Sequence, residues 1–158
     1  MIRRQNLRSP EHRRHSPASG AEAWDRPLNI LLADDSPDNR LLIRTFFKRT
    51  PHRLDEAEDG EAALRKFGAG RYDLILMDVQ MPVLDGLETT RRIRRIERES
   101  GADPVPIIAL TASVLSENVR ECLEAGADAH LGKPVSQKSL FVAIRKAASH
   151  DFSQAAEF

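Results

Sequence analysis

The sequence predicts an α/β fold in which helices cover both faces of a parallel sheet. Segments of strand length alternate five times with segments of helical periodicity, and the connections between them are short. The most apolar strand segment, 74–77 (Leu-Ile-Leu-Met), has no polar alternation, which is typical of a parallel strand buried on both faces. We therefore expect a doubly wound sheet with right-handed crossovers.

Length and composition indicate one soluble globular domain. The 158 residues carry 24 Lys and Arg against 24 Asp and Glu, so no net charge attracts the chain to nucleic acid or an anionic membrane. Cys122 is the only cysteine, which excludes an internal disulfide, and its helical spacing predicts a buried hydrophobe. There is no apolar run near the roughly 18 residues that span a bilayer, and no secretory signal. We expect a cytoplasmic protein that binds neither nucleic acid nor a membrane directly.

The chain divides into three parts. Residues 1–27 contain six arginines against three acidic residues and few apolar ones, which predicts a flexible basic arm or linker. Trp24 is its one large apolar residue and is expected to pack where the arm meets the domain. The globular pattern covers 28–148, and 149–158 is expected to be a frayed tail.

The first strand is predicted at 28–33 and is followed by an amphipathic helix that runs to about Lys48. Ser36 is a favourable N-cap, and Pro37 suits the first helical position. The apolar side of this helix is expected to consist of Leu41, Leu42, Thr45 and Phe46.

The next strand, 53–57, is less apolar than the others and is predicted at an edge of the sheet. After the turn at 59–60, a helix is predicted over 61–67, ended by the glycines within 68–70.

The second half of the domain contains three more strand and helix pairs. Strand 74–77 precedes a helix over 87–98 with an arginine-rich exposed side, and strand 107–110 precedes a helix that Gly126 ends. That fourth helix is marked by Leu115, Val119, Cys122 and Leu123. A short strand at 129–131 is followed by a final helix that Ser136 caps and whose core residues are Leu140, Ile144 and Ala147.

A polar group follows each buried strand, where the carboxyl ends meet at one edge of the sheet and ligands bind. These groups are Asp34, Asp35, Asp78, Thr111 and Lys133. Three converging carboxylates repel one another unless a hard divalent cation such as Mg2+ binds them. Lys133 and Thr111 add a positive charge and a hydroxyl donor suited to phosphoryl oxygens. The set predicts a phosphoryl-binding site in which Asp78 is the candidate nucleophile.

The chain from about Asn29 to Ala148 resembles a receiver domain of two-component phosphorelay signalling. The resemblance lies in I-L-L-A-D-D-S, L-I-L-M-D-V-Q-M-P-V-L-D-G, I-I-A-L-T-A, G-A-D-A-H-L and G-K-P. It implies a flavodoxin-like fold of five parallel strands in the order 2-1-3-4-5, with five helices. The Q-M-P loop and Asp38-Asn39-Arg40 resemble receivers attached to hybrid kinases.

The resemblance also implies roles for the clustered residues. Asp78 would accept a phosphoryl group from a phosphohistidine on a sensor histidine kinase or a histidine phosphotransfer protein. Mg2+ would be held by Asp34, Asp35, Asp78 and the Val79 carbonyl, with Asp35 the more direct ligand of the first two. Thr111 would swing toward the phosphoryl group, and Lys133 would pair with it. Pro134 would follow a cis peptide.

Three further positions are expected to modulate the site. Gln80 and Ser113 would flank the attacking water and tune the lifetime of the phosphoryl group. Receivers usually carry Tyr or Phe where this chain has His130, and that ring moves inward with Thr111. An imidazole is smaller and titrates near neutral pH. An exposed polar residue on a short strand is an equally open interpretation of His130.

The functional prediction is a phosphoacceptor signalling domain rather than an enzyme, although it would assist its own phosphorylation and dephosphorylation. It would signal by onward phosphotransfer, or through a protein target or receiver dimer at the face of the fourth helix, fifth strand and final helix. The alternatives are a phosphorylation-independent binding module and a Mg2+-dependent phosphatase of the haloacid dehalogenase type. The phosphatase motif D-x-D-x-T fails at residues 34–37, and no glycine-rich nucleotide loop is present.

Overall fold

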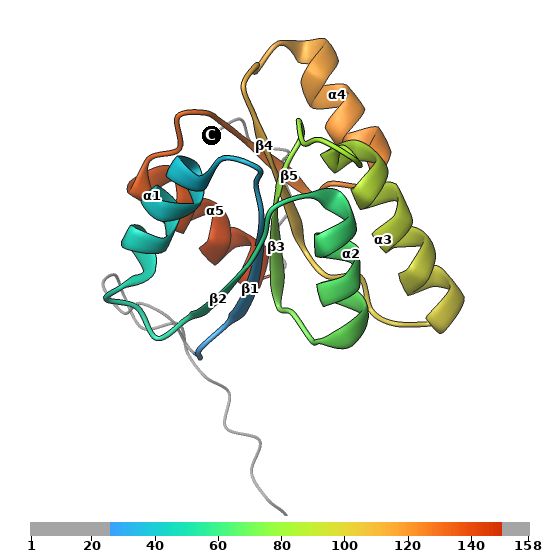
Figure 1. The fold of residues 1–158 in the computed structure, drawn as a ribbon, viewed down its shortest axis with the longest axis horizontal. Helices are drawn as coiled ribbons and strands as arrows, with labels where there is room; N and C mark the ends of the chain where they lie inside the picture. Colours follow the sequence, from blue (N-terminus) through green and yellow to red (C-terminus); the bar gives the residue numbers. More distant parts are fainter. Residues whose placement is uncertain (1–25, 150–158) are drawn as a thin grey trace, which may run out of the picture.

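The computed structural model of the chain describes residues 26–149, which form one parallel sheet flanked by helices (Figure 1). The strands are β1 (Asn29–Ala33), β2 (Arg53–Ala57), β3 (Leu74–Asp78), β4 (Ile107–Thr111) and β5 (Ala129–Gly132). The helices are α1 (Pro37–Phe47), α2 (Gly60–Ala69), α3 (Gly86–Ser100), α4 (Ser116–Ala125) and α5 (Gln137–Ala148). The strand order is β2-β1-β3-β4-β5, which confirms the predicted fold class. Trp24 and nearly all of the predicted arm and tail lie outside the described residues, so those boundaries stay predictions.

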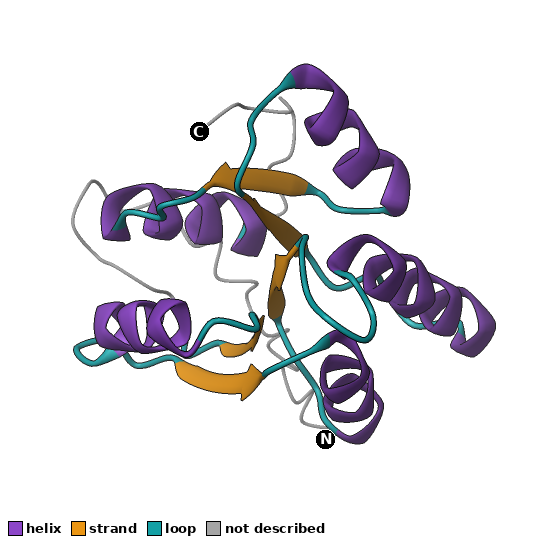
Figure 2. Cartoon of the chain, turned by 45° about the horizontal axis from the view of Figure 1, so that its top comes forward, coloured by secondary structure: helices purple, strands orange, loops and turns teal. Residues whose placement is uncertain are grey.

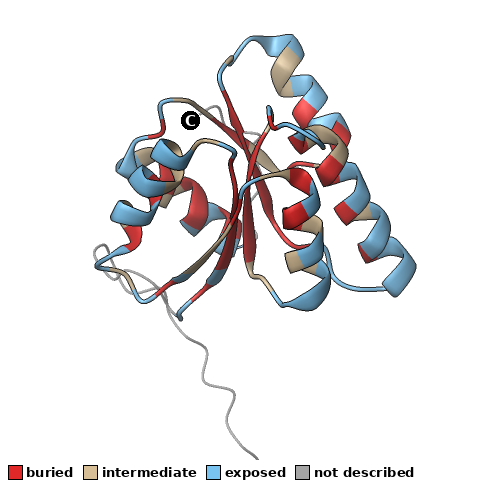
Figure 3. Cartoon of the chain, viewed as in Figure 1, coloured by how far each residue is buried: buried red, intermediate tan, exposed pale blue. Residues whose placement is uncertain are grey.

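The sheet separates two apolar layers (Figure 2). Helices α1 and α5 pack on one face, and α2, α3 and α4 pack on the other. Alternate residues of β1 serve the two layers, since Ile30 and Leu32 join the first and Leu31 and Ala33 join the second. Every residue of β3 is buried, as Figure 3 shows for the centre of the sheet. The weakly apolar β2 lies at the sheet edge, as its composition predicted.

Side chains cap the helix starts that the sequence marked. The Ser36 hydroxyl accepts the Asn39 N–H at 3.3 Å, and the Ser136 hydroxyl accepts the Ser139 N–H at 3.1 Å. None of the helices within 26–149 has an apolar stretch long enough to cross a membrane.

The predicted apolar side of α1 is wrong except at Phe46, which is half-buried and packs against the core. Leu41 and Leu42 are 54% and 42% exposed, whereas Ile43 and Phe47 are buried. Apolar residues stand at consecutive positions in this helix, so its periodicity permits two adjacent faces, and only packing against the sheet selects one. The Phe47 ring meets the Phe141 ring of α5 edge-on, with centroids 5.6 Å apart, and so joins the two helices of this layer.

The prediction for α4 is partly wrong. Leu115 precedes the helix and is 70% exposed, and Leu123 is 37% exposed. Cys122 and Ala125 are the buried residues of this helix, which confirms that the lone cysteine is a core residue. The helix thus faces the sheet with small side chains, and Leu123 and the preceding Leu115 lie outside that contact.

The arginine-rich side of α3 is exposed except at Arg94, whose side chain is only 13% exposed. Its guanidinium donates to the Glu97 carboxylate at 2.8 Å and to the Asp128 carboxylate at 2.9 Å. It also donates to the carbonyls of Gly126 and Val105, at 2.9 and 2.8 Å. This network ties α3 to the loops that lead into β4 and β5.

His52 makes the stability of the domain depend on pH. Its buried ring accepts the Leu28 N–H through Nδ1 at 3.0 Å, and burial lowers the pKa of His52 from 6.5. As the pH falls below 6.5, the unfolded chain binds a proton that the folded chain resists. We therefore expect the contribution of His52 to the free energy of unfolding to fall as the pH falls through 6.5, as denaturant titrations would measure.

The matched variant for this prediction is His52→Gln, which keeps an acceptor but does not titrate. Its free energy of unfolding should depend less steeply on pH around 6.5. An identical pH dependence in both proteins would show that another group is responsible.

Candidate functional site

A cluster of charged side chains lies at the carboxyl edge of the sheet. Asp34 follows β1 and is 0% exposed, and Asp78 ends β3 and is 3% exposed. Asp35 is exposed beside them. Lys133, which follows β5, reaches both buried carboxylates, with Nζ 3.2 Å from Asp34 Oδ2 and 3.1 Å from Asp78 Oδ1. The strand order brings Asp34 and Asp78 together, because β1 and β3 are neighbours in the sheet, and Lys133 reaches them from the end of β5.

Local backbone contacts fix the two buried carboxylates. Asp34 Oδ1 accepts the Ser36 N–H at 2.9 Å, and Asp78 Oδ1 accepts the Gln80 N–H at 3.3 Å. Helix α3 begins directly against Asp78, because a Cβ on Gly86 would lie 1.9 Å from the Asp78 carbonyl oxygen. Only glycine permits this approach, so Gly86 sets the position of the candidate nucleophile.

Burial and charge shift the pKa values in this cluster. Removal of Asp78 from water raises its pKa to about 6, and the neighbouring Asp34 charge acts in the same direction. The Lys133 ammonium opposes this rise. Burial alone would lower the pKa of Lys133, but its hydrogen bond to Asp78 and the two carboxylate charges raise it. Lys133 is therefore cationic, and Asp78 is ionised at neutral pH.

The acidic residues fit a hard divalent cation. One carboxylate oxygen each from Asp34, Asp35 and Asp78 lies within 4.8 Å of the other two. Asp34 Oδ2 is buried and has no hydrogen bond of good geometry, although Lys133 Nζ forms an ion pair with it. A buried carboxylate oxygen in that state is suited to metal coordination. Mg2+ matches the oxygen donors and the small number of carboxylates.

A groove of about 590 Å³ opens beside the cluster. Among the predicted residues, Asp35, Val79, Gln80, Thr111 and Ser113 line it. The sequence prediction missed other lining residues, namely Met81, Pro82, Asp85, Leu87, Ala112, Asn118 and Glu121. Asn118 and Glu121 belong to α4 and carry no sequence signal, since they reach the groove only through the packing of α4.

The Thr111 hydroxyl is turned toward the loop after β4. Its Oγ1 donates to the Ser113 carbonyl at 2.7 Å and accepts the Ser113 N–H at 3.2 Å. Both contacts must break before this hydroxyl could reach a group bound to Asp78. The hydroxyl thus joins the end of β4 to the loop that precedes α4.

His130 is 6% exposed, so its interpretation as an exposed polar residue is wrong. It pairs in register with Ala109 of the neighbouring β4. A switching role for His130 stays a prediction. The peptide bond between Lys133 and Pro134 is cis, as the resemblance implied.

The raised pKa of Asp78 predicts a stability effect in the absence of metal. Between 3.8 and about 6 the folded chain keeps a proton that the unfolded chain releases, so this contribution to stability is lost as the pH rises through that interval. We expect Asp78→Asn to raise the free energy of unfolding above about pH 7 by about 1–3 kcal/mol.

Denaturant titrations in a chelator at several pH values would measure this difference. The gap between Asp78→Asn and the unaltered chain should widen from about pH 4 to 6 and then stay constant. A gap that narrows with rising pH would contradict the direction of the shift.

The profile of response regulator receiver domains matches residues 30–145. The sensor histidine kinase GacS of Pseudomonas protegens is 36% identical over 141 residues, which cover 89% of this chain and 15% of GacS. The aerobic respiration control sensor protein ArcB of Escherichia coli is 40% identical over 120 residues, which cover 75% of this chain and 15% of ArcB. The chain thus spans about 15% of the length of these curated relatives.

Solved structures with the same fold include a chain from the co-crystal of the Saccharomyces cerevisiae histidine phosphotransfer protein Ypd1 with the receiver domain of Ssk1. It matches with a TM-score of 0.75 and 31% identity, over 78% of this chain and 90% of that one. The receiver domain of the sensor histidine kinase PA1611 of Pseudomonas aeruginosa has a TM-score of 0.70 and 37% identity. The match covers 78% of this chain and 99% of that domain. That structure has a magnesium ion coordinated in its active site cleft.

Proposed function

The chain belongs to the family of response regulator receiver domains, which signal in two-component systems, and from this premise we propose that Asp78 accepts a phosphoryl group from a phosphohistidine. The observation that carries the proposal is the buried Asp78 carboxylate, held at the end of β3 with Lys133 Nζ 3.1 Å away. An ionised carboxylate whose neighbours Val79 and Gln80 line a groove, beside a fixed cation, has the properties of a phosphoryl acceptor.

The transfer is a displacement at phosphorus. An Asp78 carboxylate oxygen forms the new O–P bond, and the P–N bond to the donor imidazole breaks and leaves its electron pair on the ring nitrogen. Lys133 lies where it can pair with a phosphoryl oxygen on Asp78. When bound, Mg2+ would supply charge neutralisation to the phosphoryl group.

Asp34, Asp35, Asp78 and the Val79 carbonyl would hold this Mg2+. The Val79 carbonyl already accepts the Gly86 N–H at 2.9 Å, but a carbonyl oxygen has a second lone pair for a metal. The exposed Asp35 can coordinate directly, whereas Asp34 is tied to Ser36 through its other oxygen. Gln80 and Ser113 line the groove, and we assign them to the tuning of phosphoryl lifetime.

The phosphodonor is a sensor histidine kinase or a histidine phosphotransfer protein. The likeness to GacS and to the chain from the Ypd1–Ssk1 co-crystal supports this class of partner. After phosphorylation, Thr111 leaves Ser113 and bonds the phosphoryl group, and His130 moves with it. A protein target, or a second receiver, would then recognise this conformational change at the face formed by α4, β5 and α5.

The direct test is incubation with a small phosphodonor and Mg2+, followed by intact mass, for the unaltered chain beside Asp78→Asn. We expect a mass gain of one phosphoryl group that requires Mg2+ and is absent in the variant. Beryllofluoride with Mg2+ should also shift the resonances of Thr111 and Lys133.

The competing function is a phosphorylation-independent binding module. It predicts neither a mass gain nor a response to beryllofluoride. A mass gain that persists in Asp78→Asn would instead place the acceptor elsewhere in the chain.

A further inference from the structure

We propose that Arg40 is a positioning residue that fixes the peptide unit between Asp34 and Asp35, an inference that rests on the proposed Mg2+ site. Arg40 lies on α1, and its Nη1 donates to the Asp34 carbonyl at 2.7 Å. That carbonyl belongs to the peptide unit that joins the two acidic residues. Its orientation decides where the exposed Asp35 side chain starts and therefore where its carboxylate can lie.

The other backbone polar group of Asp34 is also anchored. Its N–H donates to the Ala57 carbonyl, the last residue of β2, at 3.1 Å. The Asp34 side chain is held separately by the Ser36 N–H, at 2.9 Å from Oδ1. With Arg40 on the carbonyl, Asp34 is held at its N–H, at its carbonyl and at one carboxylate oxygen, which suits a site that must hold two carboxylates in one geometry.

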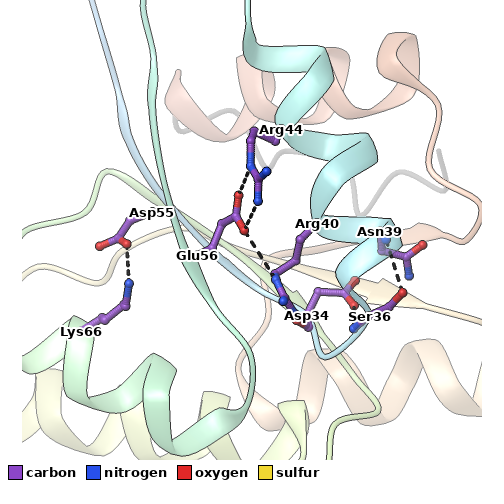
Figure 4. A network of polar contacts seen from close by, with 8 residues as sticks. All are labelled: Asp34, Ser36, Asn39, Arg40, Arg44, Asp55, Glu56 and Lys66. Carbon is purple, nitrogen blue, oxygen red and sulfur yellow. Dashed lines mark hydrogen bonds and ion pairs between the residues drawn. The ribbon is translucent and has the colours of Figure 1, made fainter.

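Glu56 of β2 holds Arg40 in place. Glu56 Oε2 lies 3.4 Å from Arg40 Nε, and the two side chains are 22% and 17% exposed. Arg44, one turn further along α1, donates to both Glu56 oxygens at 2.6 and 2.8 Å (Figure 4). These bonds hold the pKa of Glu56 below its usual range, so it stays ionised. The Arg40 guanidinium is therefore held by Glu56 of the edge strand β2, and Glu56 is itself held by Arg44 of α1.

The charge of Arg40 and its hydrogen bond act on a bound cation in opposite directions. By charge alone, a guanidinium near the site repels Mg2+, so its removal would strengthen Mg2+ binding. As a positioning residue, it holds the ligands in geometry, so its removal weakens Mg2+ binding. Glu56 offsets the positive charge and leaves the donated hydrogen bond. The sign of the change in Mg2+ affinity separates the two roles.

The test is a Mg2+ titration without phosphodonor, followed by backbone amide resonances, for the unaltered chain, Arg40→Met and Arg40→Lys. We expect Arg40→Met to weaken Mg2+ binding by about tenfold. The Mg2+ affinity of Arg40→Lys should lie between those of the unaltered chain and Arg40→Met. One ammonium cannot reproduce the guanidinium, which contacts the Asp34 carbonyl and Glu56 with different nitrogens. The Asp35 amide, which lies in the same peptide unit, should shift in metal-free Arg40→Met.

Arg98→Met is the matched control, since it removes an exposed arginine from the last turn of α3 and should leave Mg2+ affinity unchanged. Glu56→Gln, which releases Arg40 without removing it, should weaken binding by a smaller factor. Equal or tighter Mg2+ binding in Arg40→Met would overturn the positioning role alone. No Mg2+ binding by the unaltered chain would overturn the proposed metal site and this inference with it.

Discussion

Replacing Lys133 with Met is expected to slow the phosphorylation of Asp78 by about 100-fold or more. Lys133 Nζ lies 3.1 Å from Asp78 Oδ1, so it is placed to bond the phosphoryl oxygens as transfer proceeds. A preorganised cation in a partly buried site stabilises the charge of the transition state far more than it would in water. The measurement is the initial rate of mass gain with a small phosphodonor at saturating Mg2+.

The same substitution should have the opposite effect on metal binding. Without the ammonium, Asp34 and Asp78 lose the positive charge nearest to them, so Mg2+ should bind more tightly while phosphoryl transfer slows. This divergence distinguishes loss of the phosphoryl contact from collapse of the site, which would weaken both. A phosphorylation rate equal to that of the unaltered chain would exclude the assigned role of Lys133.

Replacing Arg94 with Met is expected to lower the free energy of unfolding by about 3–5 kcal/mol. Its partner Glu97 is only 4% exposed and would be left as a buried carboxylate without its cation. The Gly126 and Val105 carbonyls would lose a donor at the same time. Denaturant titration with a constant slope would measure the loss.

Arg91→Met on the same helix is the matched control. Arg91 pairs with Glu88 at 3.3 Å, with the same i, i+3 spacing as Arg94 and Glu97, but its side chain is 50% exposed. We expect this variant to change the free energy of unfolding by no more than about 0.5 kcal/mol. If Arg94→Met and Arg91→Met lowered the free energy of unfolding equally, the stabilising role assigned to the buried Arg94 network would be contradicted.

The strands could be placed from the sequence because their signal is local. A strand buried on both faces must be apolar at every position, and 74–77 and 107–110 satisfy this without reference to any partner. The polar residues that end these strands could be grouped for a similar reason, since carboxyl ends share one edge in any parallel sheet. Asp34, Asp78 and Lys133 therefore lie together as the sequence predicted.

The helix faces could not be placed in the same way. In α1, consecutive apolar residues allowed two faces, and the sheet buries Ile43 and Phe47 instead of Leu41 and Leu42. In α3, Arg94 has the same residue type as its exposed neighbours and differs only in what lies beneath it. His130 is buried although it is polar, and no local pattern on the short strand β5 encodes that burial.

The sequence by itself determined the order of the elements, the sheet edge at which the site forms and the residue types that form it. Only the tertiary structure decided which groups hold those residues. Arg40 donates to the Asp34 carbonyl, and Glu56 forms an ion pair with Arg40. The physical reason is that strand formation and strand-end position follow from local composition. A hydrogen bond between α1 and β2 depends on how the crossover sets the helix on the sheet, which only the packed chain fixes.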